Sequence, residues 1–243
     1  QIIPIQDITG NPESFDGRMK TISFQIESGI LFDRSNPSHQ KQAQELQIKP
    51  IDIVVCNLYP FEKDQTIENI DVGGPTMIRA AAKNFKHVIV VVDPDDYERV
   101  VGALKNPRLE LRKELAAKAF AHLSLYDAQI AQHLKDEPFP KEVTLPGRKV
   151  MDLRYGENPH QKAALYLQPN TNSPLKNLKR LHGRELSLVN ITDINAGLAS
   201  IRMFSEPAAV VIKHNTPCGI ALGGTAKEAL QRAIQADAQS AFG

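Results

Sequence analysis

A lysine and a histidine stand side by side directly after an apolar run in the second half of the chain. The run covers 208–212, and Lys213 and His214 follow it without a spacer. A buried or cation-flanked lysine loses its proton more easily, and a histidine titrates near neutrality. The pair is therefore a candidate for proton transfer, although a solvated strand end explains the same residues equally well.

The cysteine behind this pair raises the alternative of a metal site. Pro217 and Cys218 match the first half of the Pro-Cys-x-x-Cys signature of zinc deaminases, but position 221 is alanine. Cys56 lies far away in the sequence, after another apolar run. With so few soft ligands we predict no metal, and both cysteines are expected to be free thiols in a reducing cytoplasm.

Two glycines before a predicted helix form a second candidate site. Gly73 and Gly74 leave backbone N–H groups open to close approach, and Pro75 suits the first position of a helix. A helix N-terminus favours an anion such as a phosphate. A tight turn would also explain the glycines, and Lys83 also suits an ordinary solvated helix position.

Three Val- and Ile-rich runs, with helical patterns between them, must position these groups. The runs at 51–56, 87–92 and 208–212 do not alternate, which is typical of parallel strands covered on both faces. A stripe of apolar residues spaced by three or four predicts a long helix over 109–134. Strands that alternate with helices indicate an α/β fold, in which ligands bind beyond the carboxyl ends of the strands.

Composition limits the partners. The 243 residues include 29 Lys and Arg against 28 Asp and Glu, so we expect neither nucleic acid nor an anionic membrane as the main partner. The sequence shows no apolar run long enough for a membrane span and no signal-peptide pattern, and we predict a cytoplasmic protein. A Pro-rich, charged segment at 136–147 predicts a boundary between domains of residues 1–146 and 147–243.

Six segments, in order along the chain, resemble the family of bifunctional AICAR transformylase/IMP cyclohydrolases of purine biosynthesis. They are DGRMKT (16–21), CNLYPF (56–61), IENIDVGGPT (67–76), RAAAKN (79–84), LRYGENPHQ (153–161) and IKHNTPCG (212–219). The resemblance implies an incomplete methylglyoxal-synthase-like domain with a parallel sheet, followed by the start of a cytidine-deaminase-like transformylase domain. It also implies formyl transfer from 10-formyltetrahydrofolate to AICAR, dehydrative ring closure of formyl-AICAR to IMP, and a homodimer.

The resemblance assigns roles in the cyclohydrolase. Lys20 and Tyr59 would stabilise the oxygen that gains charge as the carboxamide nitrogen attacks the formyl carbon. Asp71 and Lys83 would move protons. The groups that would hold the nucleotide are Arg18, Asn57, Gly73 and Gly74.

It also assigns roles in the transformylase. Lys213 and His214 become the pair that removes a proton from the AICAR amine as this poor nucleophile attacks. Arg154 would contact a phosphate or the carboxamide. The other residues implied to bind AICAR are Tyr155, Asn190 and Gly243.

The sequence departs from the family at several positions near these sites. Ser23 and Glu27 stand where the family has histidines, and Leu188 and Val189 replace a tyrosine and an asparagine. The alternative hypothesis is therefore a non-catalytic nucleotide-binding module. The polar groups that the sequence retains at both sites argue against it. Because family segments at both ends have no counterpart here, we expect an internal fragment without full transformylase turnover.

Overall fold

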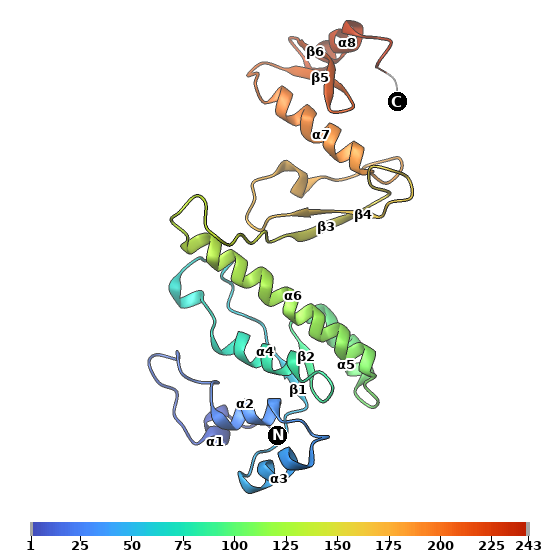
Figure 1. The fold of residues 1–243 in the computed structure, drawn as a ribbon. Helices are drawn as coiled ribbons and strands as arrows, with labels where there is room; N and C mark the ends of the chain where they lie inside the picture. The colour runs from blue at the N-terminus through green and yellow to red at the C-terminus, as the bar shows by residue number, and fades with distance from the viewer. Residues whose placement is uncertain (1, 242–243) are drawn as a thin grey trace. The chain divides into compact units, whose positions relative to one another are not determined.

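The structure is a computed structural model that describes residues 2–241. The chain divides into two compact units, Gln1–Pro146 and Gly147–Gly243. Both units combine helices with short strand pairs, so the predicted mixture of α and β structure is confirmed (Figure 1).

The first unit is built on two parallel strands, β1 (Ile53–Val55) and β2 (Ile89–Val91). The parallel pairing of two of the three predicted strands is thereby confirmed, but β1 is not covered on both faces as predicted, since Val55 is 54% exposed. Helix α4 (Gly73–Lys83) lies between them in the chain, and α6 (Leu109–Leu134) packs against α4 and β2. The other elements of this unit are α1 (Ile5–Thr9), α2 (Phe24–Leu31), α3 (Pro37–Glu45), η1 (Ile67–Asn69), η2 (Pro94–Asp96) and α5 (Tyr97–Ala103).

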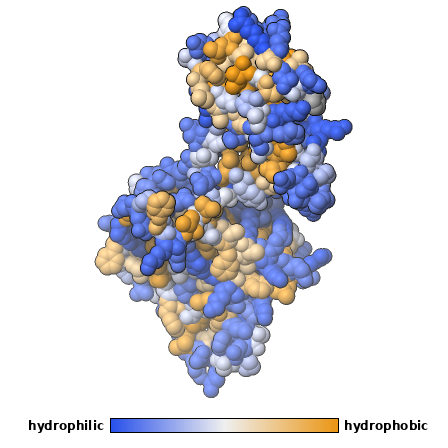
Figure 2. All heavy atoms as spheres, turned by 45° about the horizontal axis from the view of Figure 1, so that its top comes forward, coloured by the Kyte–Doolittle hydropathy of each residue, from blue (hydrophilic) through white to orange (hydrophobic). Residues whose placement is uncertain are grey.

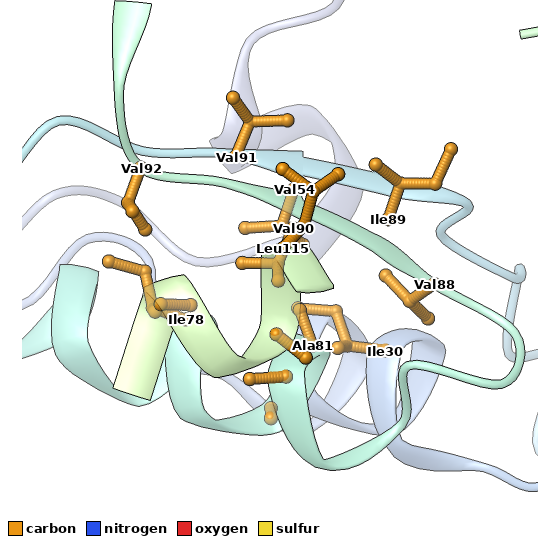
Figure 3. Packing of buried hydrophobic residues seen from close by; sticks show 14 of the residues in the cluster. Ile30, Val54, Ile78, Ala81, Val88, Ile89, Val90, Val91, Val92 and Leu115 are labelled. Atoms are coloured by element: carbon orange, nitrogen blue, oxygen red, sulfur yellow. The ribbon is translucent and has the colours of Figure 1, made fainter. Parts of the chain in front are cut away.

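The core of the first unit lies between the strand pair and the helices. Ile78 from α4, Leu115 from α6 and Ile30 from α2 pack against the valines of β2. Figure 3 shows Val92 pointing toward Ile78, whereas Val91 points to the opposite face, as strand geometry requires. Burying one such side chain contributes about 1.5–3 kcal/mol, so these contacts hold the strand ends in place.

Helix α6 begins and ends where its apolar periodicity predicted. The stripe residues Leu115, Ala119, Leu123 and Tyr126 are buried, whereas Leu134 at the end of the stripe is 53% exposed. Helix α4 begins at Gly73, two residues before the predicted first position at Pro75. Proline still fits there, because the first N–H groups of a helix have no partner within it.

The second unit contains two antiparallel strand pairs. The first consists of β3 (Arg148–Leu153) and β4 (Ala163–Leu167), and the second of β5 (Ala208–Lys213) and β6 (Thr216–Leu222). Its helices are η3 (Pro174–Asn177), α7 (Leu188–Ile201) and α8 (Ala226–Ala236). Leu153, Leu175 and Ile191 form a small buried cluster.

The prediction of a fully covered parallel strand at 208–212 was wrong. β5 pairs antiparallel with β6, and its six residues are only half-buried. Both α7 and α8 contact this hairpin, which explains the apolar run. The sequence did not predict the partner strand β6, because β6 contains Pro217 and Gly219, which are unfavourable in strands.

The surface is mixed in character. Figure 2 shows orange hydrophobic side chains among blue hydrophilic ones on the face in view. Within residues 2–241, no helix has the length and apolar character needed to cross a membrane.

Candidate active sites

In the first unit, the loop before α4 is organised around Asp71. Its carboxylate accepts a hydrogen bond from the backbone N–H of Gly74 at 2.8 Å. A Cβ on Gly74 would lie 2.7 Å from Asp71 Oδ2 and 2.9 Å from a methyl carbon of Leu58, so a side chain would displace the carboxylate. A Cβ on Gly73 would collide with the hydroxyl of Thr21. The glycines thus allow close packing, and the N–H of Gly74 is bonded to the protein's own carboxylate.

Tyr126 of α6 fixes the backbone of this loop. Its hydroxyl accepts a hydrogen bond from Asp71 N–H at 2.8 Å and donates one to the carbonyl of Asn69 at 2.8 Å. Its ring meets the ring of Phe61 edge-on, with centroids 6.3 Å apart. Burial raises the pKa of Tyr126 above its usual value, so the hydroxyl remains a donor at neutral pH.

Lys20 and Tyr59 lie near each other, and their sequence neighbours Thr21 and Leu58 lie against Gly73 and Gly74 of this loop. Lys20 Nζ pairs with Glu13 Oε2 at 2.8 Å, and this hydrogen bond raises the pKa of Lys20 above its ordinary value. The proximity of Tyr59 raises the pKa of Lys20 further. Lys20 is therefore a cation at neutral pH, suited to stabilising negative charge rather than to accepting a proton.

The predicted nucleotide contacts Arg18 and Asn57 are held by neighbours within the unit. The Arg18 guanidinium forms an ion pair with Glu68, and both side chains are exposed. Asn57 donates its amide to the hydroxyl of Tyr97 at 3.1 Å. Both side chains therefore have a hydrogen-bonding partner within the protein.

Cys56 follows β1 next to Asp71. Its backbone N–H continues the strand ladder to the carbonyl of Val91 at 3.0 Å. Burial raises the pKa of the Cys56 thiol to about 11, and the charge on Asp71 adds to that rise. The thiol is free, as predicted, and it is protonated at neutral pH, so it acts as a packing group.

Lys83 lies apart from Asp71, the other residue predicted to move protons in ring closure. It is the last residue of α4, whereas Asp71 precedes the first turn of that helix. At a rise of about 1.5 Å per residue, roughly 15 Å separate the two ends. The two residues therefore do not share a proton in this arrangement.

Two hollows lie along the groove between α4 and α6. One of about 440 Å³ is lined by residues that include Asp71, and another of about 530 Å³ is lined by residues that include Lys83. Arg79 lines both hollows and pairs with Asp127 of α6 at 2.6 Å. Arg79 thus supplies positive charge between Asp71 and Lys83.

In the second unit, Arg154 and Tyr155 lie beside the start of α7. Arg154 N–H donates to the carbonyl of Leu186 at 2.8 Å, and the carbonyl of Tyr155 accepts from Leu188 N–H at 3.1 Å. The Arg154 guanidinium lies 4.8 Å from the centroid of the Tyr155 ring and donates to its hydroxyl at 3.2 Å. The backbone bonds therefore hold both predicted AICAR contacts at a helix N-terminus.

Asn190 belongs to the cap of the same helix. Ser187 Oγ accepts from Asn190 N–H at 3.4 Å, and Asn190 Oδ1 accepts from Ser187 N–H at 3.0 Å. This reciprocal capping box places Asn190 in the first turn, together with Leu188 and Val189. Any contact of Asn190 with a substrate would fall to its amide NH2 group. The predicted contact Gly243 lies outside the described residues.

His214 and Asn215 form the tight turn between β5 and β6. Their φ angles of 51° and 64° are left-handed, as in the type I′ turns that usually contain Asn-Gly. Asn215 N–H donates to Oδ1 of Asp193 at 2.8 Å. Because Asp193 lies one helical turn after Asn190, the turn is attached near the same end of α7 as the predicted AICAR contacts.

Lys213 lies on the other face of the hairpin. The side chain of Ile212 packs on Gly197 of α7, so strand alternation places Lys213 on the face toward α8. There, hydrogen bonds from Ser240 lower the pKa of Asp237, and the charge of Lys213 lowers it further. The two members of the predicted proton-handling pair therefore have different surroundings.

Cys218 occupies a bulge in β6. Val211 pairs with Gly219 and Ile212 with Pro217, which leaves Cys218 without an opposite residue. Its thiol donates to the carbonyl of Val211 at 3.4 Å. No group of three His, Cys, Asp or Glu side chains within residues 2–241 is arranged to hold a metal ion.

Three residues that support the predicted groups were missed in the sequence. Arg79 lies four residues before Lys83, a spacing that places both on one face of a helix and so offered a local signal. Tyr126 and Asp193 act across 55 and 22 residues of sequence, so no local pattern marks them.

This chain is similar to known proteins over its whole length. A family model described as AICARFT/IMPCHase bienzyme matches residues 81–243. Proteins called bifunctional purine biosynthesis protein PurH are 47% identical in Oceanobacillus iheyensis and 49% in Shouchella clausii, and each match covers 100% of this chain. The chain spans about half the length of these curated relatives, since it covers 50% of each. A solved structure described as the crystal structure of ForH is 37% identical over 53% of this chain and 72% of its own, with a TM-score of 0.48.

Proposed function

This chain belongs to the AICARFT/IMPCHase bienzyme family, and from that membership we propose that it contributes to both sites of a bifunctional enzyme of purine biosynthesis. Residues 1–146 would close the ring of formyl-AICAR to give IMP, as a methylglyoxal-synthase-like domain. Residues 147–243 would belong to a cytidine-deaminase-like domain that formylates AICAR with 10-formyltetrahydrofolate.

The observation that carries the cyclohydrolase proposal is the cation at Lys20 beside Tyr59, next to the Asp71 loop. In ring closure, the carboxamide nitrogen attacks the formyl carbon, and negative charge grows on the formyl oxygen. The Lys20 ammonium and the Tyr59 hydroxyl are suited to stabilise that oxygen, since a lysine is a cation at neutral pH and the Glu13 carboxylate holds Lys20 Nζ at 2.8 Å.

Asp71 and Lys83 lie at opposite ends of α4, and we propose a separate role for each. Asp71 is anchored at both its carboxylate and its backbone N–H, which suits a group that accepts the carboxamide proton. Lys83, at the other end of α4, would contact a different part of the same nucleotide, together with Arg79. The nucleotide contacts at Arg18, Asn57 and the two glycines stay part of the proposal.

The transformylase proposal rests on the arrangement at the start of α7. Arg154 and Tyr155 present a cation, a ring and a hydroxyl beside a helix N-terminus, where negative and polar groups of AICAR are favoured. His214, in the turn attached to the same helix, would take the proton of the amine as it attacks the formyl carbon. Lys213 would take part in the same proton transfer from the face of the hairpin toward α8.

The remaining parts of the proposal concern assembly and location. We propose a cytoplasmic homodimer, because the family resemblance implies a dimer. Sedimentation velocity at micromolar concentration would show one species of twice the protomer mass. A single monomeric species would contradict the proposed homodimer.

The function is tested on the polypeptide encoded by the complete reading frame that contains these residues. Incubation with AICAR and 10-formyltetrahydrofolate should yield formyl-AICAR and then IMP, and formyl-AICAR alone should yield IMP. Chromatography of the nucleotides distinguishes the two steps. Binding of IMP without either conversion would replace this proposal with the non-catalytic module.

A further inference from the structure

We propose that Tyr126 is a positioning residue for ring closure, acting through Asp71. This inference rests on the cyclohydrolase function proposed for the first unit. Tyr126 lies on α6, is 7% exposed, and is separated from Asp71 by 55 residues of sequence. Its hydroxyl bonds to the backbone N–H of Asp71 and not to the carboxylate that would react, so its role is to place that carboxylate.

The hydroxyl of Tyr126 uses both its donor and its acceptor function on one loop. It accepts from Asp71 N–H and donates to the carbonyl of Asn69, each at 2.8 Å. The two bonds clamp the backbone on both sides of Ile70. Phenylalanine at this position would keep the ring but would leave one N–H and one carbonyl without this partner.

The Asp71 carboxylate depends on that clamp. Its own anchor is the N–H of Gly74 at 2.8 Å, which fixes one oxygen but not the backbone that carries the side chain. With the backbone held by Tyr126 and one oxygen by Gly74, the direction of the carboxylate is set. Without Tyr126, one of these two constraints disappears.

The ring of Tyr126 links this loop to the one that carries Tyr59. Phe61, which is 1% exposed, meets the Tyr126 ring at an interplanar angle of 70° and the His133 ring at 83°. Helix α6 therefore holds the Tyr59 loop by its aromatic face and the Asp71 loop by its hydroxyl. Tyr126 takes part in both contacts.

The test is Tyr126→Phe in the polypeptide from the complete reading frame. Loss of both hydrogen bonds of the hydroxyl predicts that kcat for ring closure of formyl-AICAR falls at least about tenfold, with KM changed less than about twofold. Formyl transfer to AICAR in the same protein should be unchanged. Tyr166→Phe, on β4 of the second unit, is the matched control and should change neither activity.

A double-mutant cycle separates positioning from general stabilisation. In an Asp71→Asn background, Tyr126→Phe should cause no further loss of kcat, because the group it positions is gone. The same fractional loss in both backgrounds would overturn the inference, as would an unchanged kcat in Tyr126→Phe beside an active wild type. A wild type that does not cyclise formyl-AICAR would overturn the proposed function, and the inference with it.

Discussion

The two units hold their candidate groups by different means. In the first, the groups lie in loops after a buried strand and before a helix, and a buried tyrosine of α6 ties those loops together. In the second, the histidine lies in a turn of two left-handed residues, and a half-buried aspartate of α7 holds that turn. Left-handed non-glycine residues cost energy, so the second arrangement needs a direct bond to the strained backbone.

Among substitutions that leave the proposed reacting groups in place, the largest expected effect comes from filling the space beside the Asp71 carboxylate. Gly74→Ala would bring a Cβ within 2.7 Å of Asp71 Oδ2. Misplacing a reacting group by about 1 Å can cost about 100-fold in rate, so we expect a loss of that size in ring closure. Formyl transfer should be preserved, and steady-state assays of both steps check this.

A matched glycine supplies the control for that variant. A Cβ on Gly102, in α5, would meet nothing within 4 Å, so Gly102→Ala should leave both activities unchanged. Equal losses from the two alanine variants would show that space beside Asp71 is not the cause.

The next effect tests the clamp of the second unit. Asp193→Ala removes the acceptor of Asn215 N–H, so the turn that carries His214 is held less firmly. We expect formyl transfer to fall about tenfold, as for one lost charge-assisted hydrogen bond, with ring closure unchanged. Asp193→Asn retains a side-chain oxygen and should restore most of the rate. Equal losses for the alanine and asparagine variants would contradict the role of the bond.

The smallest effect is a pH dependence of the stability of the first unit. Hydrogen bonds from Ser35, at 2.6 and 2.8 Å, lower the pKa of Asp33 to about 2, and His87 at 3.0 Å contributes. An unfolded aspartate titrates near about 3.9, so this stabilisation is present above that pH and is lost as the pH falls toward 2. Asp33→Asn should lower the urea midpoint at pH 6, with the difference from wild type shrinking by pH 3. A difference that is independent of pH would exclude this linkage.

The sequence predicted those elements whose pattern is local. Helix α6 was predicted from Leu109 to Leu134 because one face carries apolar residues at helical spacing, and β1 and β2 because their runs are short and rich in Val and Ile. The pairing of β5 was mispredicted, because an apolar run indicates that a strand is covered by other elements but not whether its partner strand is parallel or antiparallel. The turn after it was missed because His214-Asn215 lacks the glycine that usually marks such hairpins.

Some residues of the candidate sites could also be predicted from the sequence, and others could not. The pair Lys213 and His214 and the two glycines Gly73 and Gly74 could be found because each set follows or precedes an element that the sequence reveals, whereas Arg154 and the role of Asp71 came only from the family resemblance. Tyr126 and Asp193 could not be found, because their roles depend on tertiary contacts. Tyr126 was in fact assigned correctly to the buried stripe of α6, but its hydroxyl partners are visible only in the fold.

The central claim is that the two units house separate chemical steps, and reciprocal substitutions test it most directly. Both activities would be measured for His214→Ala and Asp71→Asn in the polypeptide from the complete reading frame, with the exposed His182→Ala as control. We predict that His214→Ala loses formyl transfer by at least about 100-fold and keeps ring closure, and that Asp71→Asn does the reverse. Loss of ring closure in His214→Ala, with formyl transfer intact, would contradict the account.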